Sequence, residues 1–209
     1  MLTRLDTLIV EFDIGLRTLL TKPCSIRTHP DADIAEADLT DREKKQAGAL
    51  MRVNHSGEVC AQALYSGQAL TAHNPQISAS LKQAAAEETE HLAWCETRIA
   101  QLGSHTSLLN PIFYTASFTI GAIAGALGDQ WSLGFVAETE KQVGAHLASH
   151  LDQLPLSDQK TRKIVTQMQL DEAKHALEAQ KLGAAKLPLP VNFLMQQVSK
   201  LMTTSTYYL

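Results

Sequence analysis

The sequence has few aromatic residues, few cysteines and no long run of basic residues. Aromatic residues make up 5% of its 209 residues, whereas hydrophobic residues of all types make up 44%, with Ala and Leu dominant. Such side chains favour closely packed helices over a sandwich of β-strands. The formal net charge is −4 and the Lys and Arg residues are dispersed, so the chain shows no electrostatic footprint for nucleic acid.

The three cysteines are Cys24, Cys60 and Cys95, and no two of them form a Cys-x-x-Cys pair. An odd and scattered set predicts neither a disulfide framework nor a zinc site. We therefore expect all three to be small buried apolar residues in a reducing compartment. The N-terminal segment carries Asp6 and Glu11 and lacks a small-residue cleavage site, which argues against a secretory or transit peptide. The protein is expected in the cytoplasm or on its membrane.

Four long helices are predicted from the spacing of apolar residues. Thr40 and Glu43 form a capping box before the first helix. Asn74 opens the second helix, and we expect Ser157 to cap the fourth. The four helices are expected at about residues 40–72, 74–102, 129–154 and 157–182. Together they predict an all-α single domain over residues 1–209, with its bundle core at about 40–185.

Two further amphipathic helices are predicted outside the bundle core. Residues 2–20 place apolar side chains at helical spacings, and this helix would either pack on the bundle or lie on a membrane surface. Residues 191–202 follow a proline-rich break and form a last amphipathic helix. We expect this last helix to pack back on the bundle.

Residues 111–128 form the most membrane-like stretch of the chain, because these eighteen residues contain no charge. Gly121 and Gly125 make a Gly-x-x-x-Gly pattern, which predicts a close contact between helices. Three alternatives remain open: a transmembrane helix, a core or crossover helix, and a partly exposed helix that dips into one leaflet. The stretch lies between the two pairs of long helices, where a four-helix bundle with one long crossover has its connection.

An internal repeat gathers four glutamates and two histidines. Glu88 and His91 lie three positions apart, and Glu172 and His175 repeat this spacing. On a helix, residues three apart lie on one face. A further glutamate precedes the two pairs by 30 and 32 positions, each within an apolar helical stripe. The six candidate metal ligands are Glu58, Glu88, His91, Glu140, Glu172 and His175. This is the ligand pattern of a carboxylate-bridged di-iron bundle.

The charge of this set requires a counter-charge. Four glutamates buried together would be strongly destabilising, because each loses hydration and all repel one another, whereas two divalent cations neutralise them. Oxygen-rich ligation with two imidazoles favours iron or manganese over zinc or copper, and open coordination positions favour dioxygen chemistry. We expect one ion at Glu58 and His91, the other at Glu140 and His175, and bridges from Glu88 and Glu172.

The residue before each Glu-x-x-His is also acidic: Glu87 in the first copy and Asp171 in the second. Outer carboxylates commonly fix the ring of a metal-bound histidine. We therefore expect Asp171 to contact His91 and Glu87 to contact His175 across the bundle. His55, His146 and His150 are not part of the repeat. His146 lies six residues after Glu140, too far round the helix to be assumed a ligand, and a hydrogen-bonding role for it in a pocket is left open.

Four blocks carry a resemblance to a known family: residues 52–58 (RVNHSGE), 88–91 (ETEH), 136–140 (VAETE) and 171–175 (DEAKH). Over roughly residues 40–185 the chain resembles the demethoxyubiquinone hydroxylase family of ubiquinone biosynthesis, bacterial type, and it matches all six ligand positions. The resemblance implies a ferritin-like bundle that holds two Fe ions, Fe²⁺ in the reduced state. The implied activity is a di-iron monooxygenase that uses O₂ to hydroxylate the ring of demethoxyubiquinol, a late step of ubiquinone (coenzyme Q) biosynthesis.

The resemblance also implies partners and a location. The expected partners are a polyprenylated quinol and O₂, with peripheral association on the cytoplasmic face of the inner membrane. No motif identifies the electron donor or the oligomeric state, association with a ubiquinone-biosynthesis complex is left open, and no nucleic-acid partner is expected. Two alternatives remain. A ferritin-like ferroxidase shares the ligands but needs a cage surface, and a di-iron tRNA hydroxylase needs a basic surface.

Overall fold

A computed structural model describes residues 3–209 of the chain, and those residues form seven α-helices and no β-strand. The all-α class predicted from the sequence is confirmed. The amphipathic helix predicted at residues 2–20 began at residue 2, which lies outside the described residues. Along the chain the helices are α1 (Arg4–Leu20), α2 (Asp41–Thr71), α3 (Pro75–Gln101), α4 (Asn110–Ala126), α5 (Asp129–Gln153), α6 (Gln159–Lys181) and α7 (Leu189–Tyr208).

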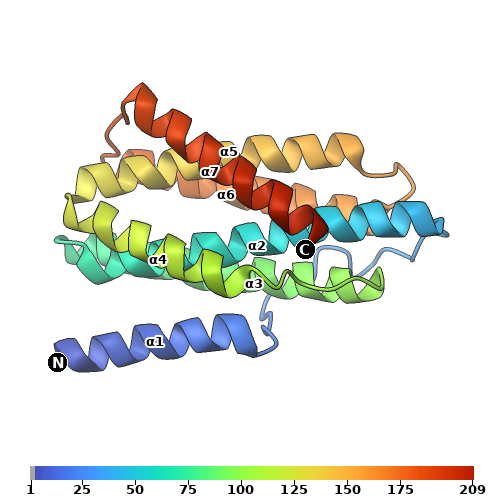
Figure 1. Ribbon diagram of the computed structural model, residues 1–209, viewed down its shortest axis with the longest axis horizontal. Helices are drawn as coiled ribbons and strands as arrows, with labels where there is room; N and C mark the ends of the chain where they lie inside the picture. The colour runs from blue at the N-terminus through green and yellow to red at the C-terminus, as the bar shows by residue number, and fades with distance from the viewer. Residues whose placement is uncertain (1–2) are drawn as a thin grey trace.

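Two antiparallel hairpins, α2 with α3 and α5 with α6, form a four-helix bundle (Figure 1). The connection between the hairpins contains α4, which lies along α2, and α7 crosses the front of the bundle diagonally and packs on α2 and α5. The predicted ferritin-like bundle with one long crossover is therefore confirmed. The last helix does pack back on the bundle, and it is longer than the predicted residues 191–202 because it continues to Tyr208.

The first turns of α2 and α6 differ in how well the sequence predicted them. The capping box before α2 is present, with Thr40 N donating to Glu43 Oε2 at 2.8 Å and Glu43 N donating to Thr40 Oγ1 at 3.3 Å. The cap of α6 is Asp158, so the prediction of Ser157 was wrong. Asp158 Oδ1 accepts from Thr161 N at 3.1 Å and also from a buried guanidinium group, that of Arg98, at 2.8 Å. A charged acceptor with a buried cation holds this position more firmly than a serine hydroxyl.

Glycines allow α4 to lie directly against α2. A Cβ atom added at Gly121 would lie 2.1 Å from the carbonyl oxygen of Leu64, and one added at Gly125 would lie 2.2 Å from Thr71 Oγ1. The backbones of the two helices can approach this closely only because glycine has no side chain. The close contact predicted from the Gly-x-x-x-Gly pattern is confirmed.

The opposite face of α4 is exposed and apolar. Ile112 and Ile123 are 65% and 56% exposed, whereas Tyr114 is buried against the bundle. Among residues 3–209, no helix has the length and hydrophobicity needed to cross a bilayer. The transmembrane alternative for residues 111–128 was therefore wrong. The segment is a crossover helix with one packed face and one exposed apolar face.

Helix α1 lies along one side of the bundle (Figure 1) and packs on α2 and α4. Glu11 is only 6% exposed, and the Thr18 hydroxyl donates to the Gln62 side chain on α2. Large apolar side chains point away from the bundle, and Leu5 and Phe12 are 66% and 68% exposed. Packing on the bundle, one of the two alternatives for this helix, is present, but the amphipathic pattern is turned outward.

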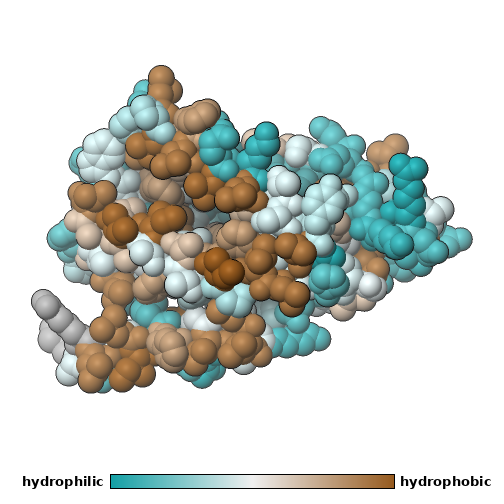
Figure 2. Space-filling view, in the orientation of Figure 1, coloured by the Kyte–Doolittle hydropathy of each residue, from teal (hydrophilic) through white to brown (hydrophobic). Residues whose placement is uncertain are grey.

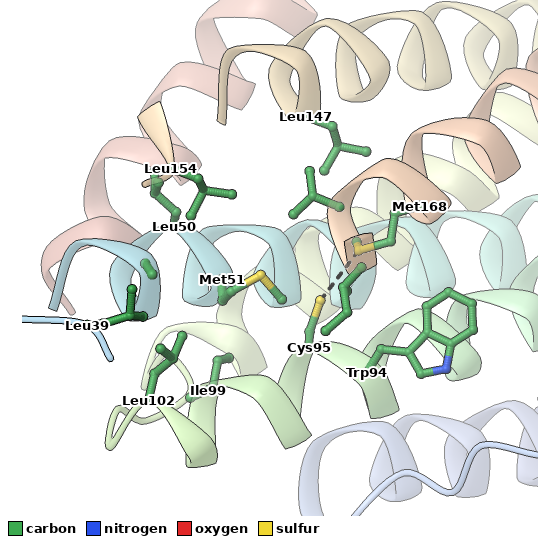
Figure 3. Close-up of a cluster of buried hydrophobic side chains, with 13 residues drawn as sticks. Leu39, Leu50, Met51, Trp94, Cys95, Ile99, Leu102, Leu147, Leu154 and Met168 are labelled. Carbon is green, nitrogen blue, oxygen red and sulfur yellow. Dashed lines mark hydrogen bonds between the residues drawn. The ribbon is translucent and has the colours of Figure 1, made fainter. Parts of the chain in front are cut away.

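Two apolar clusters lie at successive levels of the bundle and leave a polar level between them. The first cluster includes Met51, Trp94, Cys95 and Met168 and is drawn in Figure 3. The second includes Tyr65, Leu81, Leu133 and Ala179. On both α3 and α6, the Glu-x-x-His motif lies between residues of the first cluster and residues of the second. The apolar clusters therefore close the polar level from both ends.

The cysteines divide among three environments. Cys95 is buried in the first apolar cluster, as predicted, and Cys60 is half-buried. Cys24 is exposed, so the prediction that all three cysteines are buried was wrong. Cys24 lies in the irregular connection between α1 and α2, which runs over the surface and offers no helical face to bury it.

Candidate metal centre

The polar level of the bundle contains all six predicted ligand residues. Each of the four bundle helices contributes at least one of them, and each helix presents them on the stripe that faces its neighbours. No member of the set is more than 6% exposed. They are Glu58 on α2, Glu88 and His91 on α3, Glu140 on α5, and Glu172 and His175 on α6. The repeat read from the sequence therefore converges on one place in the fold.

Around His91 the side chains form the first of two groups. His91 Nδ1 lies 3.0 Å from Glu88 Oε2, 3.1 Å from Glu172 Oε1 and 3.4 Å from Glu58 Oε2. One ligand atom from each of these four residues lies within 4.8 Å of the others. Three carboxylate oxygens and one imidazole nitrogen at this spacing could hold a divalent metal ion.

Around His175 the side chains form the second group. His175 Nδ1 lies 3.2 Å from Glu172 Oε2, 3.4 Å from Glu88 Oε1 and 4.0 Å from Glu140 Oε1. Their ligand atoms also lie within 4.8 Å of one another. This group has the same composition as the first: three carboxylates and one imidazole.

Glu88 and Glu172 belong to both groups. Glu88 directs Oε2 toward His91 and Oε1 toward His175, and Glu172 directs Oε1 toward His91 and Oε2 toward His175. Each of these carboxylates thus offers one oxygen to each group. That is the arrangement of a carboxylate that bridges two metal ions.

The electrostatics of the cluster fit a pair of cations. Burial, followed by the neighbouring carboxylates, raises the pKa values of Glu58 and Glu140 well above their usual range. Burial alone would lower the pKa of His175, but the surrounding carboxylates raise it to about 10. Neither carboxylate oxygen of Glu140 has a hydrogen-bond partner among the described residues. Unpaired buried carboxylate oxygens are costly, and divalent cations would satisfy them.

The outward-facing nitrogens of both histidines contact the two predicted acidic residues. His91 Nε2 lies 3.3 Å from Asp171 Oδ2, and His175 Nε2 lies 2.8 Å from Glu87 Oε2. Both contacts predicted from the sequence are present. When Nε2–H donates to these carboxylates, Nδ1 keeps its lone pair and faces the cluster.

An apolar cavity of about 320 Å³ has two lining residues that directly precede candidate ligands in the sequence. Its wall includes Gly57 next to Glu58, and Thr139 next to Glu140, and it extends between α2, α4, α5 and α7. Helix α7 contributes Leu194, Met195, Val198 and Met202 to its wall. Sequence reasoning missed this wall, because the apolar pattern of α7 does not indicate which neighbour it covers.

A buried polar group links α4 to the glutamate-bearing part of α2. Ser56 Oγ donates to Asn110 Oδ1 at 2.7 Å, and Asn110 Nδ2 lies 3.3 Å from His55 Nδ1. Burial lowers the pKa of His55 to about 4, so this ring stays neutral at physiological pH. His55 therefore contacts Asn110 and lies outside both groups of candidate ligands, as expected from the repeat. Sequence reasoning missed Asn110, which begins the crossover helix.

The fold and this cluster together define a ferritin-like helical bundle with a buried carboxylate and histidine site that could hold metal. The model of the family described as "Ubiquinone biosynthesis protein COQ7" matches residues 45–206. The chain therefore belongs to the COQ7 family, and the resemblance seen in its sequence motifs is confirmed.

Individual relatives agree with this assignment. The chain is 60% identical to the 3-demethoxyubiquinol 3-hydroxylase of Chromobacterium violaceum, over 97% of this chain and 98% of that protein. It is 57% identical to the protein of the same name from Nitrosospira multiformis, over 98% of each chain. A relative of this name from Laribacter hongkongensis is 57% identical over 98% of this chain and 100% of that protein. At this similarity over nearly the full length, the chain is an enzyme of the hydroxylase class.

Proposed function

We propose that this chain is a di-iron monooxygenase that hydroxylates the ring of demethoxyubiquinol with O₂, a late step of ubiquinone biosynthesis. The observation that carries the proposal is the six-residue cluster together with an apolar cavity, in a chain whose relatives are named 3-demethoxyubiquinol 3-hydroxylase. Glu58 and His91 would hold one iron and Glu140 and His175 the other. Glu88 and Glu172 would bridge the pair.

Two iron ions bound in this cluster would supply the activation of O₂. The residues of the chain supply the setting. Asp171 and Glu87 hold the two imidazole rings with Nδ1 turned inward. The apolar clusters above and below exclude water from the polar level. A dry surrounding strengthens the interaction of the carboxylates with bound cations.

The cavity is suited to a quinol with a polyprenyl tail. Its lining is almost entirely apolar, with residues such as Leu64, Phe113 and Met195. Gly57 and Thr139, which precede two of the candidate ligand glutamates in the sequence, line the cavity, and we infer that the end they line faces the cluster. A ring at that end would meet the metal centre while the tail lies between α4 and α7.

An exposed apolar surface surrounds this part of the molecule. Figure 2 shows apolar side chains gathered over α1, α4 and α7, whereas the opposite end of the bundle is hydrophilic. Exposed members of this surface include Phe12, Ile112, Ile123, Phe193 and Leu201. Large exposed apolar surfaces mark sites of association with proteins or membranes. We propose that this surface binds the cytoplasmic face of the inner membrane, from which a lipid-like substrate enters.

Quinone analysis of a strain that lacks this protein tests the proposal. The strain should accumulate demethoxyubiquinone, and the wild-type chain should restore ubiquinone. Glu172→Ala should fail to restore it, because that residue contacts both groups. Glu178→Ala is the matched control, since Glu178 is exposed on the same helix. A normal quinone profile in the deletion strain would refute the proposal, and iron loading of many ions per chain would favour a ferroxidase.

A further inference from the structure

The connection between α1 and α2 is fastened to α3 beside the metal centre. Glu90, the residue before His91, accepts hydrogen bonds from the backbone nitrogens of Ile26 and Arg27, both at 3.1 Å. The hydroxyl of Ser25 also donates to Glu90. A carboxylate with three donors from one short segment fixes the path of that segment. Residues 25–27 therefore lie in a defined position over α3.

This anchoring places the side chain of Arg27 between α3 and α6. Its guanidinium carbon lies 4.7 Å from the centre of the Trp94 ring, and its Nη2 lies 2.9 Å from Asp171 Oδ2. Trp94 is itself held, because its Nε1 donates to Ser25 Oγ at 3.2 Å. A planar guanidinium group that stacks on an aromatic ring and pairs with a carboxylate has little freedom to move.

The oxygen of Asp171 that meets Arg27 is also the one that meets His91. Asp171 Oδ2 lies 2.9 Å from Arg27 Nη2 and 3.3 Å from His91 Nε2. Lys174 contacts the other oxygen, Oδ1, at 2.9 Å, but its side chain is 67% exposed. The side chain of Arg27 is 38% exposed, so solvent screens it less than Lys174, and it contacts the oxygen that meets His91. Arg27 is therefore the cation that orients this oxygen.

The second histidine has a different arrangement. Glu87 Oε2 contacts His175, and Glu87 Oε1 accepts from Gln83 Nε2 at 3.0 Å. Asp171 has the same kind of support, because its Oδ1 accepts from Gln167 Nε2 at 3.1 Å, so the difference lies in the cations. The side chain of Glu87 is 38% exposed, whereas that of Asp171 is 5% exposed. Within residues 3–209, no Lys or Arg side chain forms an ion pair with Glu87. The two halves of the repeat are therefore alike in their ligands and unlike in the support of those ligands.

We propose that Arg27 is a positioning residue of the metal centre, which acts through Asp171 on His91 and makes the Glu58 and His91 position bind metal more tightly than the Glu140 and His175 position. Without Arg27, Asp171 Oδ2 would lose its guanidinium partner while Oδ1 keeps Lys174 and Gln167, so the carboxylate would turn away from His91. The ring of His91 would then be free to rotate away from the cluster. Loss of an outer partner of a metal ligand commonly weakens metal binding about 10- to 100-fold.

Titration of the metal-free full-length chain with Mn²⁺ tests this role, with free Mn²⁺ followed by electron paramagnetic resonance. The role of Arg27 rests on the proposed metal centre, so the wild-type chain must bind two equivalents. In Arg27→Gln, the tighter equivalent should weaken about 10- to 100-fold and the other should change little. Arg27→Lys keeps the charge without the planar group and should lose less. Arg42→Gln is the control, because Arg42 is exposed at the beginning of α2 and should leave both equivalents unchanged.

The same substitution in a Glu140→Ala variant shows which of the two metal positions Arg27 affects. Glu140→Ala removes a ligand of the second group only, so Arg27→Gln added to it should weaken the single remaining equivalent by the same factor. Circular dichroism of the metal-free variants verifies that they fold, and the Lys variant provides the test if the Gln variant does not. Equal weakening of both equivalents, or no change in either, would overturn the role of Arg27. Fewer than two equivalents in the wild-type chain would overturn the metal centre, and the role of Arg27 with it.

Discussion

His175 and Glu87 meet across the bundle at 2.8 Å between Nε2 and Oε2, although they lie 88 positions apart in the sequence. His91 and Asp171 meet in the same manner from the opposite hairpins. Each histidine is thus oriented by an acidic residue that belongs to the other hairpin. The cluster depends on the packing of the two hairpins as much as on the ligands themselves.

Glu87→Ala should weaken metal binding at the position of His175. The imidazole would lose the acceptor that orients its ring, so the affinity for one of two Mn²⁺ equivalents should fall by about tenfold or more. Isothermal titration of the metal-free chain measures this. Glu178→Ala removes an exposed carboxylate from α6 and serves as the control. Unchanged affinity in the Glu87 variant would contradict the orienting role.

Gly121→Ala should destabilise the fold. The added methyl group would lie 2.1 Å from the Leu64 carbonyl oxygen, so α4 must move away from α2. Overpacking of this kind costs about 1–3 kcal/mol in the free energy of unfolding, which urea denaturation measures. At Gly144 on α5 an added Cβ meets nothing within 4 Å, so Gly144→Ala should stabilise the protein by about 0.5–1 kcal/mol. Equal effects of the two substitutions would contradict the close contact of α4 with α2.

Removal of metal should lower the thermal stability of the chain. Binding to the folded state alone adds about 2.7 kcal/mol for one site at a free metal concentration 100 times the dissociation constant. Scanning calorimetry with and without a chelator, after reconstitution with Fe²⁺ under anaerobic conditions, measures the difference. In Glu172→Ala the gain from added metal should largely disappear, because both groups lose a carboxylate oxygen. A full gain in that variant would contradict the bridging role.

The contribution of His150 to the free energy of unfolding should fall as the pH is lowered below about 6.5. Burial, followed by the nearby His146, lowers the pKa of His150 to about 3, whereas an unfolded chain has a histidine pKa of about 6.5. Between these values the unfolded state binds more protons, so the contribution of His150 falls by up to about 1.4 kcal/mol per pH unit. Above pH 6.5 both states hold it neutral and the contribution is constant.

Denaturation at a series of pH values, with His150→Gln beside the wild type, measures this contribution. The free energy of unfolding of the wild type should fall relative to that of the variant between about pH 6.5 and pH 3. His73→Gln is the control, because the His73 side chain is 67% exposed. Parallel curves for the wild type and the His150 variant would show that His150 does not titrate as described.

The double substitution Ile120→Glu and Ile123→Glu should release the protein from membranes. These side chains are 39% and 56% exposed on α4, so the substitutions add charge to the apolar surface without burying it. Flotation with anionic liposomes should show less bound protein, while the iron content stays the same. Thr115→Glu is a less disruptive comparison on the same helix, since Thr115 is exposed and polar. Unchanged flotation of the double variant would exclude α4 as a membrane-binding surface.

The sequence was sufficient to predict the bundle and the convergence of the six residues. Their spacing places Glu88 with His91, and Glu172 with His175, on the same helical stripes that carry the apolar core. A helix buries that stripe against its neighbours, so the polar residues within it must meet. The contacts of Asp171 with His91 and of Glu87 with His175 could also be predicted, because each acidic residue directly precedes a Glu-x-x-His motif and faces the opposite hairpin.

Features set by long-range contacts were beyond sequence reasoning. The preference for Asp158 over Ser157 as a cap depends on Arg98, which lies 60 positions away. The outward apolar face of α1 depends on the buried environment of Glu11, which the pattern of that helix does not reveal. The position of Arg27 depends on three hydrogen bonds that Glu90 accepts from residues 25–27. Periodicity describes one helix at a time and contains no information on such partners.

The shared carboxylates make each hairpin an incomplete chelator. The hairpin of α2 and α3 supplies Glu88 to the second group, and the hairpin of α5 and α6 supplies Glu172 to the first. Neither hairpin alone contains a full set of donors for either ion. In the proposed centre, metal binding would therefore require correct docking of the two hairpins, and a chain whose hairpins separate would lose both ions together.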